Sequence, residues 1–230
     1  MGSIERRERE RDDKRRQILN AARELFVTEG YEAVTMRKVA DKVEYTPTAI
    51  YLHFKDKQEL VREVVTQDFF AFAHHFASIA ATPDPVEGLR AMGKRYLEFA
   101  LKFPNHYRLM FMTQLPRIHE EQPAHKGNPS LDAYALLCKM VGDAIAQGRF
   151  RAEVTDVEFA AQLVWAGMHG IAALHTSCPK TDSWMKFRPV AALGRAMTDA
   201  LINHMIRPDH APPHPAAPRG KAPQRHKRRS

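Results

Sequence analysis

TPTAIYLHFK, residues 46–55, is the stretch that decides the fold of this chain. Thr46 can cap a helix with its hydroxyl, and Pro47 suits the first helical position, where a missing N–H leaves no bond unmade. Ile50 and Phe54 lie four residues apart, so both can face a small core from one side of that helix. The remaining side chains are left for phosphates and base edges. This pattern predicts the second helix of a helix-turn-helix, which enters the DNA major groove.

The residues on either side fit the same motif. A short amphipathic helix is predicted over residues 35–43, separated from the next helix by only a few residues. Upstream, residues 15–29 predict a longer helix, and Gly30 suits the position just after its end. Downstream, DKQE at residues 56–59 is a capping box that opens another helix. These elements predict a DNA-binding domain over residues 15–62 with one small core.

Candidate DNA contacts lie on and just before the two short helices. We expect Tyr51 and Lys55 at phosphates, which position a protein on the duplex, and Thr46 and Thr48 at base edges, which specify the sequence. Pro47 is suited to contact a thymine methyl group. For any one of these residues, the alternative is a solvated helix face. The full candidate set is Thr35, Arg37, Tyr45, Thr46, Pro47, Thr48, Tyr51, His53 and Lys55.

The N-terminal part of the chain resembles the TetR family of transcriptional regulators. The resemblance rests on ILNAARELF at residues 18–26, Gly30-Tyr31, Thr35-Met36-Arg37, Val39-Ala40, and IYLHF at residues 50–54. It includes order, spacing and residue type over about a quarter of the chain. One position departs from the family pattern, because Glu44 stands in the turn where the family usually has glycine. Glutamate tolerates a positive φ angle poorly, so this turn is expected to be strained or differently shaped.

Later segments resemble a C-terminal subgroup of the same family that is marked by a Trp-His-Gly motif. They are YLEFA at residues 96–100, PNHYRLMF at residues 104–111, and WAGMHG at residues 165–170. The resemblance implies a C-terminal domain that binds a small molecule, and a homodimer formed by the last two long helices.

The remaining sequence predicts only helices. Capping boxes at residues 84–87 and 155–158 open two of them, and Pro104 separates two others. We therefore expect an all-α protein, with a three-helix DNA-binding head followed by a helical ligand-binding and dimerisation domain over residues 63–206. The expected helices cover residues 57–81, 85–103, about 105–113, 130–147, about 156–175 and 183–206.

The net charge of +8 lies in the two ends of the chain. Residues 1–16 hold seven Lys/Arg against five Asp/Glu, and residues 207–230 hold seven Lys/Arg against one Asp, which leaves the stretch between them neutral. We expect a charged flexible arm at residues 1–14 and a disordered, basic, proline-rich tail at residues 207–230. The tail either contacts DNA or simply keeps the chain soluble. Phosphate attraction from these ends should depend strongly on salt.

Aromatic and sulfur-containing side chains recur at helical spacing in the second domain. Such a stripe is more often ordinary core than a binding site, but the family resemblance favours a cavity for a small hydrophobic ligand. The candidate lining residues are Tyr96, Phe99, Phe103, Tyr107, Met110, Phe111, Trp165, Met168 and His169.

The last predicted helix carries an apolar seam at three- and four-residue steps. This spacing is typical of a helix-bundle interface, and the candidate dimer contacts are Val190, Leu193, Met197, Leu201 and Met205. A dimer is needed because two heads read two half-sites about 34–36 Å apart. The expected partners are therefore a second copy of the chain and a palindromic double-stranded DNA operator.

Several other functions lack support in the sequence. The histidines form no compact ligand set with Cys or carboxylates, so we expect no metal and no cofactor. Cys138 and Cys178 imply no disulfide framework. The apolar run at residues 159–174 is interrupted by polar residues and predicts a buried helix rather than a membrane span. With a densely charged N-terminus and no signal peptide, the protein is expected in the cytoplasm.

The sequence thus predicts a homodimeric, sequence-specific transcriptional regulator, a repressor that a small hydrophobic ligand releases from DNA. Two alternatives remain open: a ligand-binding or interaction module that no longer reads DNA, and an activator with no ligand. An enzyme is not expected, because no nucleophile motif or phosphate-binding glycine loop is present.

Overall fold

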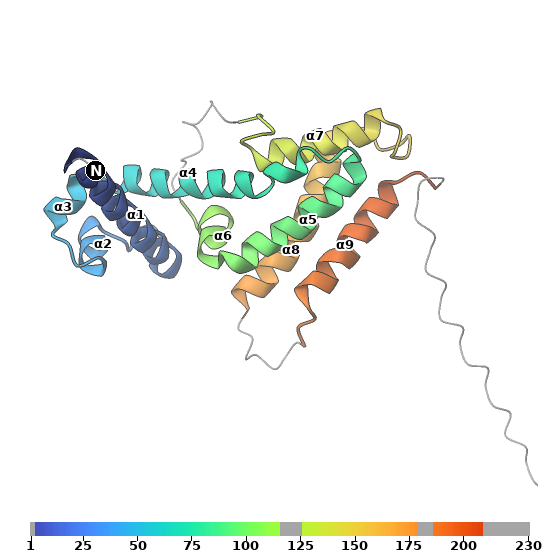
Figure 1. Cartoon of the computed structure of the whole chain (residues 1–230). Coiled ribbons are helices and arrows are strands. Elements are labelled where there is room, and N and C mark those ends of the chain that lie inside the picture. Colours follow the sequence, from blue (N-terminus) through green and yellow to red (C-terminus); the bar gives the residue numbers. More distant parts are fainter. Residues whose placement is uncertain (1–2, 116–125, 179–185, 209–230) are drawn as a thin grey trace, which may run out of the picture.

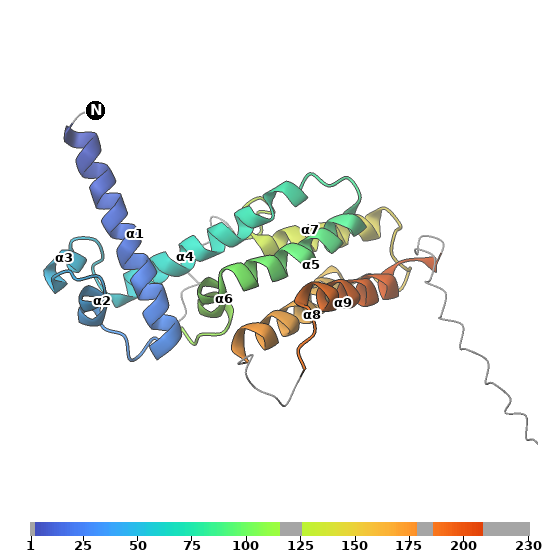
Figure 2. The ribbon, with the colours of Figure 1, turned by 60° about the horizontal axis from the view of Figure 1, so that its bottom comes forward.

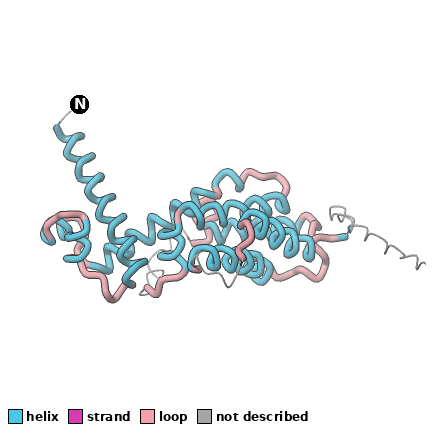
Figure 3. The backbone as a smooth tube through the Cα atoms, turned by 90° about the horizontal axis from the view of Figure 1, so that it is seen from below, coloured by secondary structure: helices cyan, strands magenta, loops and turns pink. Residues whose placement is uncertain are grey.

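The chain folds into helices joined by loops (Figure 3). Among the described residues there is also one isolated β-bridge, between Phe150 and Ile206. The computed structural model describes residues 3–115, 126–178 and 186–208. This is the expected all-α architecture. The helices are α1 Ser3–Glu29, α2 Met36–Lys42, α3 Pro47–Tyr51, α4 Lys57–His75, the 3-10 turn η1 Ala77–Ile79, α5 Pro85–Lys102, α6 Pro104–Phe111, α7 Ala133–Ala146, α8 Val157–Ser177 and α9 Val190–Met205.

The molecule is elongated, with a small head at one end and a larger body at the other (Figures 1 and 2). Helices α1, α2 and α3 form the head, and α4 runs from the head into the body. In the body, α5 packs against α7, α8 and α9. The short helix α6 lies at the junction, in contact with both α1 and α5. Each part therefore has its own core, and α4 and α6 lie between them.

Three helices begin at the caps that the sequence predicts. The hydroxyl of Thr46 accepts a hydrogen bond from the backbone N–H of Ala49 at 3.3 Å. The carboxylate of Asp56 accepts one from the Glu59 N–H at 2.7 Å, and Asp84 caps α5 in the same way. These caps satisfy N–H groups that an open helix end leaves unpaired.

Helix α1 starts at Ser3, so the residues expected to form a flexible arm, 3–14 among those described, are helical. The reason is local. Glu and Arg alternate along this segment, as in the pair Arg6–Glu10 at 3.4 Å, and such pairs four residues apart support an exposed helix. A high density of charged residues is therefore compatible with a helix when opposite charges lie four residues apart. In Figure 2 this part of α1 projects beyond the head.

Helix α4 ends at His75, six residues before its predicted end at residue 81. Phe76 and Ile79, which are 1% and 4% exposed, instead turn inward and join the body core. The Phe76 ring packs edge-on against Phe72 with 4.9 Å between centroids. Burial of these two side chains outweighs the helical preference of the alanines around them.

Two other helices begin later than predicted. Helix α7 starts at Ala133 under an Asp132 cap, and α9 starts at Val190. In α9 the cause is Pro189, which has no N–H and disfavours the helical conformation of Arg188. The predicted start at residue 183, like the proline-rich tail from residue 209 onward, lies outside the described residues.

The head core extends past the predicted boundary at residue 62. It includes Val64 and Val65 of α4 and Leu109 of α6, which is fully buried there. Leu109 lies more than 40 positions after the end of α2 in the sequence, so no local pattern could have assigned it to the head.

Candidate DNA-binding head and ligand cavity

Helices α2 and α3 form a helix-turn-helix around a shared apolar seam. Met36, Val39 and Ala40 of α2 and Ile50 of α3 are buried in the head core. Between the helices, Glu44 adopts a φ angle of 58°, and the Tyr45 N–H donates to the Ala40 carbonyl at 2.9 Å. The turn therefore keeps the left-handed conformation that favours glycine, although a glutamate occupies it.

Most of the predicted DNA contacts lie on the open surface of this motif. Tyr51 is 54% exposed on α3, and the neighbouring Leu52, which the sequence did not single out, is 75% exposed. The side chains of Arg37 and Lys55 have no ion-pair partner among the described residues, whereas Lys38 and Lys42 pair with acidic groups of α1. The exposed members of the predicted set are Thr35, Arg37, Thr46, Pro47, Thr48, Tyr51 and Lys55.

Tyr45 and His53 are partly buried and contact α1. The Tyr45 hydroxyl donates to Gln17 Oε1 at 2.6 Å. The backbone carbonyl of His53 accepts from Arg15 Nη1 at 2.9 Å, and Nδ1 of its ring is buried without a hydrogen-bond partner in the described part of the chain. The Tyr45 side chain and the His53 backbone thus tie the segments on either side of α3 to α1, and the partly buried His53 offers less of its surface to DNA than the sequence suggested.

The extended start of α1 places further positive charge beside α3. Burial lowers the pKa of His53, and the charges of Arg11, Arg15 and Lys14 lower it further. Arg15 also lies over the Phe54 ring, 4.4 Å from its centroid. Sequence reasoning missed these cations as parts of the site because Arg11 and Lys14 were assigned to a flexible arm, and Arg15 only to the start of the helix that follows it. Their only sequence signal was the basic run itself.

A cavity of about 530 Å³ lies in the body between α4, α5, α6, α7 and α8. Its wall is mostly aromatic and aliphatic, and includes Phe72, Met92, Phe111 and Val164. The charged groups among the described lining residues, Lys126 and Asp132, both lie near the start of α7. Asp132 is already engaged, because its carboxylate caps α7. The wall therefore suits an apolar molecule.

Five of the nine predicted pocket residues lie on this wall and four do not. Those on the wall are Tyr96, Met110, Phe111, Trp165 and Met168. Phe99 is 2% exposed in the body core, and Phe103 packs against it with 5.3 Å between ring centroids. Tyr107 and His169 lie behind the wall, where they hydrogen-bond to Tyr96.

Helix α4 contributes wall residues that the sequence analysis assigned only to a helix. Phe69, Phe70, Phe72 and Phe76 all line the cavity, as does Thr66. Their signal was the dense aromatic spacing between residues 69 and 76. That spacing could not show whether these rings face a cavity or a filled core.

A chain of polar side chains reaches the wall at Tyr96. Trp165 Nε1 donates to the Tyr96 hydroxyl at 3.1 Å, and the Tyr107 hydroxyl lies 2.7 Å from His169 Nδ1. Burial raises the pKa of Tyr96 to about 12 and also raises the pKa of Tyr107. Burial lowers the pKa of His169. The four groups are therefore neutral at neutral pH, and this part of the wall offers hydrogen bonds without charge.

Helices α8 and α9 present an apolar outer face. Phe159 is 68% exposed, Leu174 48% and Met197 37%, and Leu163 is also exposed. By length and composition α8 is the one helix in the described ranges that could cross a membrane. It packs against α5, α7 and α9 along its inner side, as a core helix does.

The predicted dimer seam on α9 is divided between the surface and the core. Met197 is exposed, and Val190, Leu193 and Leu201 are partly buried. Met205 is 3% exposed and belongs to the body core, so the prediction of a partner contact at this residue is wrong for the protomer surface seen here. Its spacing matched the seam, but the side chain points inward, beside Ile202 and Ile206 in the same core cluster.

A helix-turn-helix with an exposed second helix, mounted on a helical body with an apolar cavity, defines a DNA-binding regulatory protein. Residues 18–64 match the sequence model of the bacterial regulatory proteins of the tetR family. Residues 89–207 match that of the tetracyclin repressor-like C-terminal domain. The two matches together cover most of the chain, which therefore belongs to the TetR family of transcriptional regulators.

Individual relatives are similar over different shares of their length. FasR, an HTH-type transcriptional activator of Mycolicibacterium smegmatis, is 32% identical over 102 residues, which is 44% of this chain and 47% of FasR. TtgR, an HTH-type transcriptional regulator of Pseudomonas putida, is 26% identical over 180 residues, which is 73% of this chain and 82% of TtgR. The match therefore spans less than half of FasR.

Solved structures share the fold at low sequence identity. FadR of Bacillus subtilis, solved in complex with stearoyl-CoA, superposes with a TM-score of 0.64 at 17% identity, covering 81% of this chain and 96% of FadR.

Proposed function

We propose that this protein is a homodimeric transcriptional repressor whose two heads bind a palindromic operator and are released when a small hydrophobic ligand fills the cavity. One observation carries the proposal. Helix α4 starts in the head core with Leu60 and Val64 and, two turns later, lines the cavity with Phe69 and Phe72. A ligand that favours another position of α4 must therefore also change the position of the head.

On DNA, α3 lies in the major groove of each half-site. Tyr51 and Lys55 contact phosphates, and Thr46, Pro47 and Thr48 meet base edges. The free hydrogen of the Thr46 hydroxyl remains available for this, because the cap uses only its oxygen as an acceptor. Residues 15–62, with Val64, Val65 and Leu109 completing their core, provide this reading head, and the rest of residues 63–206 form the responding body.

The dimer forms through the outer face of α8 and α9. Phe159, Leu163, Leu174 and Met197 make that face apolar, which is unfavourable in water unless a partner covers it. Gly170 lies on the same outer side of α8 with open space around it. A small residue there lets a second α8 approach closely.

The ligand is an apolar compound without a charge in the cavity, because most of the wall is apolar and the charged lining residues that are described, Lys126 and Asp132, both lie near the start of α7. A long acyl chain is the first class to test, because FadR of similar fold was solved with stearoyl-CoA. That choice is an analogy at the level of the fold. We also retain the Trp-His-Gly subgroup as part of the proposal, since Trp165 and His169 both belong to the polar chain at Tyr96.

DNA reading is tested by gel shift on DNA selected from a random pool with the full-length protein. The variant Tyr51→Ala/Lys55→Ala should lose at least about tenfold in affinity, since each phosphate contact and its counterions contribute to binding. Lys94→Ala, an exposed lysine of the body, is the control and should bind like the wild type. If the wild type prefers no palindromic site, or the double variant binds normally, the proposal fails.

Dimerisation is tested by sedimentation velocity. Gly170→Arg adds a charge to the outer face where the protomer itself leaves room, so it should give monomers that remain folded. Ala152→Arg adds the same charge in the exposed turn before α8 and should stay dimeric. A Gly170→Arg dimer would place the interface elsewhere.

The sign of regulation is tested in a reporter strain that carries the selected operator upstream of a promoter. A repressor lowers expression until the ligand is added. FasR is named an activator, so the opposite outcome has a precedent among the relatives and would replace repression by activation.

A further inference from the structure

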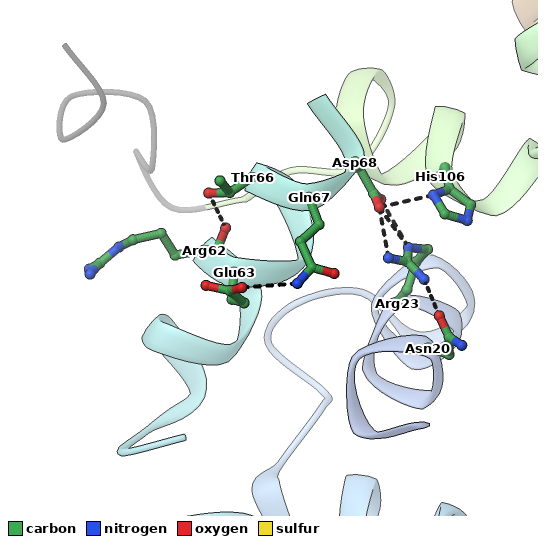
Figure 4. Close-up of polar contacts among 8 residues, drawn as sticks. All are labelled: Asn20, Arg23, Arg62, Glu63, Thr66, Gln67, Asp68 and His106. Carbon is green, nitrogen blue, oxygen red and sulfur yellow. Dashed lines mark hydrogen bonds and ion pairs between the residues drawn. The ribbon is translucent and has the colours of Figure 1, made fainter. Parts of the chain in front are cut away.

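A buried charge cluster lies where the head meets the body, outside the DNA surface and the cavity (Figure 4). Arg23 of α1 binds Asp68 of α4 with Nε 3.0 Å from both carboxylate oxygens and Nη2 2.7 Å from Oδ1. His106 Nδ1 of α6 lies 2.9 Å from the same Oδ1. Arg23 also donates to Asn20 at 2.7 Å. One carboxylate thus joins three helices.

The two charged members of the cluster depend on each other. Asp68 is 1% exposed and Arg23 is 6% exposed, so neither charge is solvated by water. Each must be neutralised by the other, because an unpaired buried charge is strongly unfavourable. His106 is different. Its side chain is 29% exposed, and Asp68 would still be neutralised by Arg23 without it. The histidine is therefore not needed for charge balance, and it adds a contact from α6.

Helix α6 faces both the head core and the cavity. Leu109 is fully buried in the head core, while the next two residues, Met110 and Phe111, line the cavity. His106 lies one turn before Met110 on this short helix. Packed interiors do not deform freely. A small shift of α6 would therefore change the cavity wall, the packing of Leu109 and the His106–Asp68 contact at the same time.

Asp68 occupies the matching position on α4. It directly precedes Phe69 and Phe70, which line the same cavity, while its carboxylate faces away toward α1. The cluster is thus attached to two cavity-lining helices and to the main helix of the head. Helix α6 therefore carries both Met110 at the cavity wall and His106, and His106 contacts Asp68, which in turn binds Arg23.

We propose that His106 is a positioning residue for the ligand response: its hydrogen bond to Asp68 transmits the displacement of α6 in the filled cavity to the Arg23–Asp68 pair and so to the head. The inference rests on the ligand-responsive function proposed above and assigns it a residue. Without the His106–Asp68 hydrogen bond, α6 still packs against its neighbours and the Arg23–Asp68 ion pair still forms, but α6 and the ion pair move independently of each other.

The test compares His106→Leu, which removes the hydrogen bond and keeps an apolar side chain beside Phe103, with His106→Gln, which retains a donor for Asp68. The probe is the uncharged fluorophore N-phenyl-1-naphthylamine, whose emission in an apolar site gives its affinity for the cavity. Operator affinity is measured by fluorescence anisotropy with the DNA selected above, with and without saturating probe. The quantity of interest is the ratio of the two operator affinities.

In the wild type this ratio should be at least about fivefold, within the usual range for coupled sites. His106→Leu should keep probe affinity and probe-free operator affinity within about twofold and bring the ratio to about one, and His106→Gln should restore it. A wild-type ratio in His106→Leu overturns the inference, and so does an equal loss in His106→Gln. A wild-type protein that binds no operator, or shows a ratio of one, instead removes the proposed function and the inference with it.

Discussion

Replacing Asp68 by alanine should destabilise the protein more than any single change on its surface. Asp68→Ala leaves the guanidinium of Arg23 buried, with only Asn20 as a polar partner among the described residues. Removing one partner of a buried ion pair costs about 3–5 kcal/mol. The stability of a typical domain is only about 5–15 kcal/mol, so the loss is a large share of the total.

The effect is measured by urea unfolding followed by circular dichroism at one fixed protein concentration, because dimerisation makes stability concentration-dependent. In thermal unfolding the same loss corresponds to a Tm lower by roughly 6–20 °C for a chain of this size. Asp199→Ala is the matched control. It removes a carboxylate that pairs with Arg90 at the surface, where Asp199 is 54% exposed, and it should change the free energy of unfolding by less than about 1 kcal/mol.

A double variant separates the buried charge from the lost contact. In Arg23→Met/Asp68→Leu both charges are gone and apolar groups of similar size remain, so most of the stability should return. The reasoning is refuted if Asp68→Ala is no more destabilising than Asp199→Ala, since the Arg23 charge must then reach water. It is also refuted if the double variant is as unstable as the single one.

Three further predictions concern the turn, the junction and pH. Glu44→Gly should stabilise the head by about 0.5–1 kcal/mol in urea unfolding, because φ at this residue is 58° and glycine accepts that value without strain; Glu44→Ala, which keeps the Cβ, should give no such gain. Leu109→Ala should lower the free energy of unfolding by about 2–5 kcal/mol, because this fully buried side chain packs in the head core. Hydrogen exchange should show a loss of protection in α1 of the head as well as in α6. A loss confined to α6 would contradict the assignment of Leu109 to the head core. Burial lowers the pKa values of His53, His75 and His169 in the folded protein. The unfolded chain therefore binds more protons than the folded one at mildly acidic pH. The free energy of unfolding should fall as pH drops through about 6.5, the ordinary histidine pKa, and should continue to fall toward the lower pKa values of the folded state. Replacing His169 by Gln should flatten that pH dependence in unfolding titrations, and an unchanged slope would exclude His169 as a contributor.

The sequence by itself determined the local parts of this protein. The caps at Thr46, Asp56 and Asp84 and the proline at position 47 act within one helical turn, so their effect can be worked out from neighbouring residues. The same holds for the apolar faces of α2 and α3. Family membership followed from these local motifs, because their order and spacing are themselves sequence features.

Only the tertiary structure decided which apolar side chains share a core and which line a cavity. Phe99 and Tyr96 have equivalent helical spacing and burial, yet only Tyr96 lies on the cavity wall. Helix α4 ends at His75, where Phe76 and Ile79 join a body core that several other helices also build. The Arg23, Asp68 and His106 cluster joins residues 38 to 83 positions apart, and no local rule relates them. Burial and long-range charge pairing depend on the whole packed arrangement, which is why they could not be derived from periodicity alone.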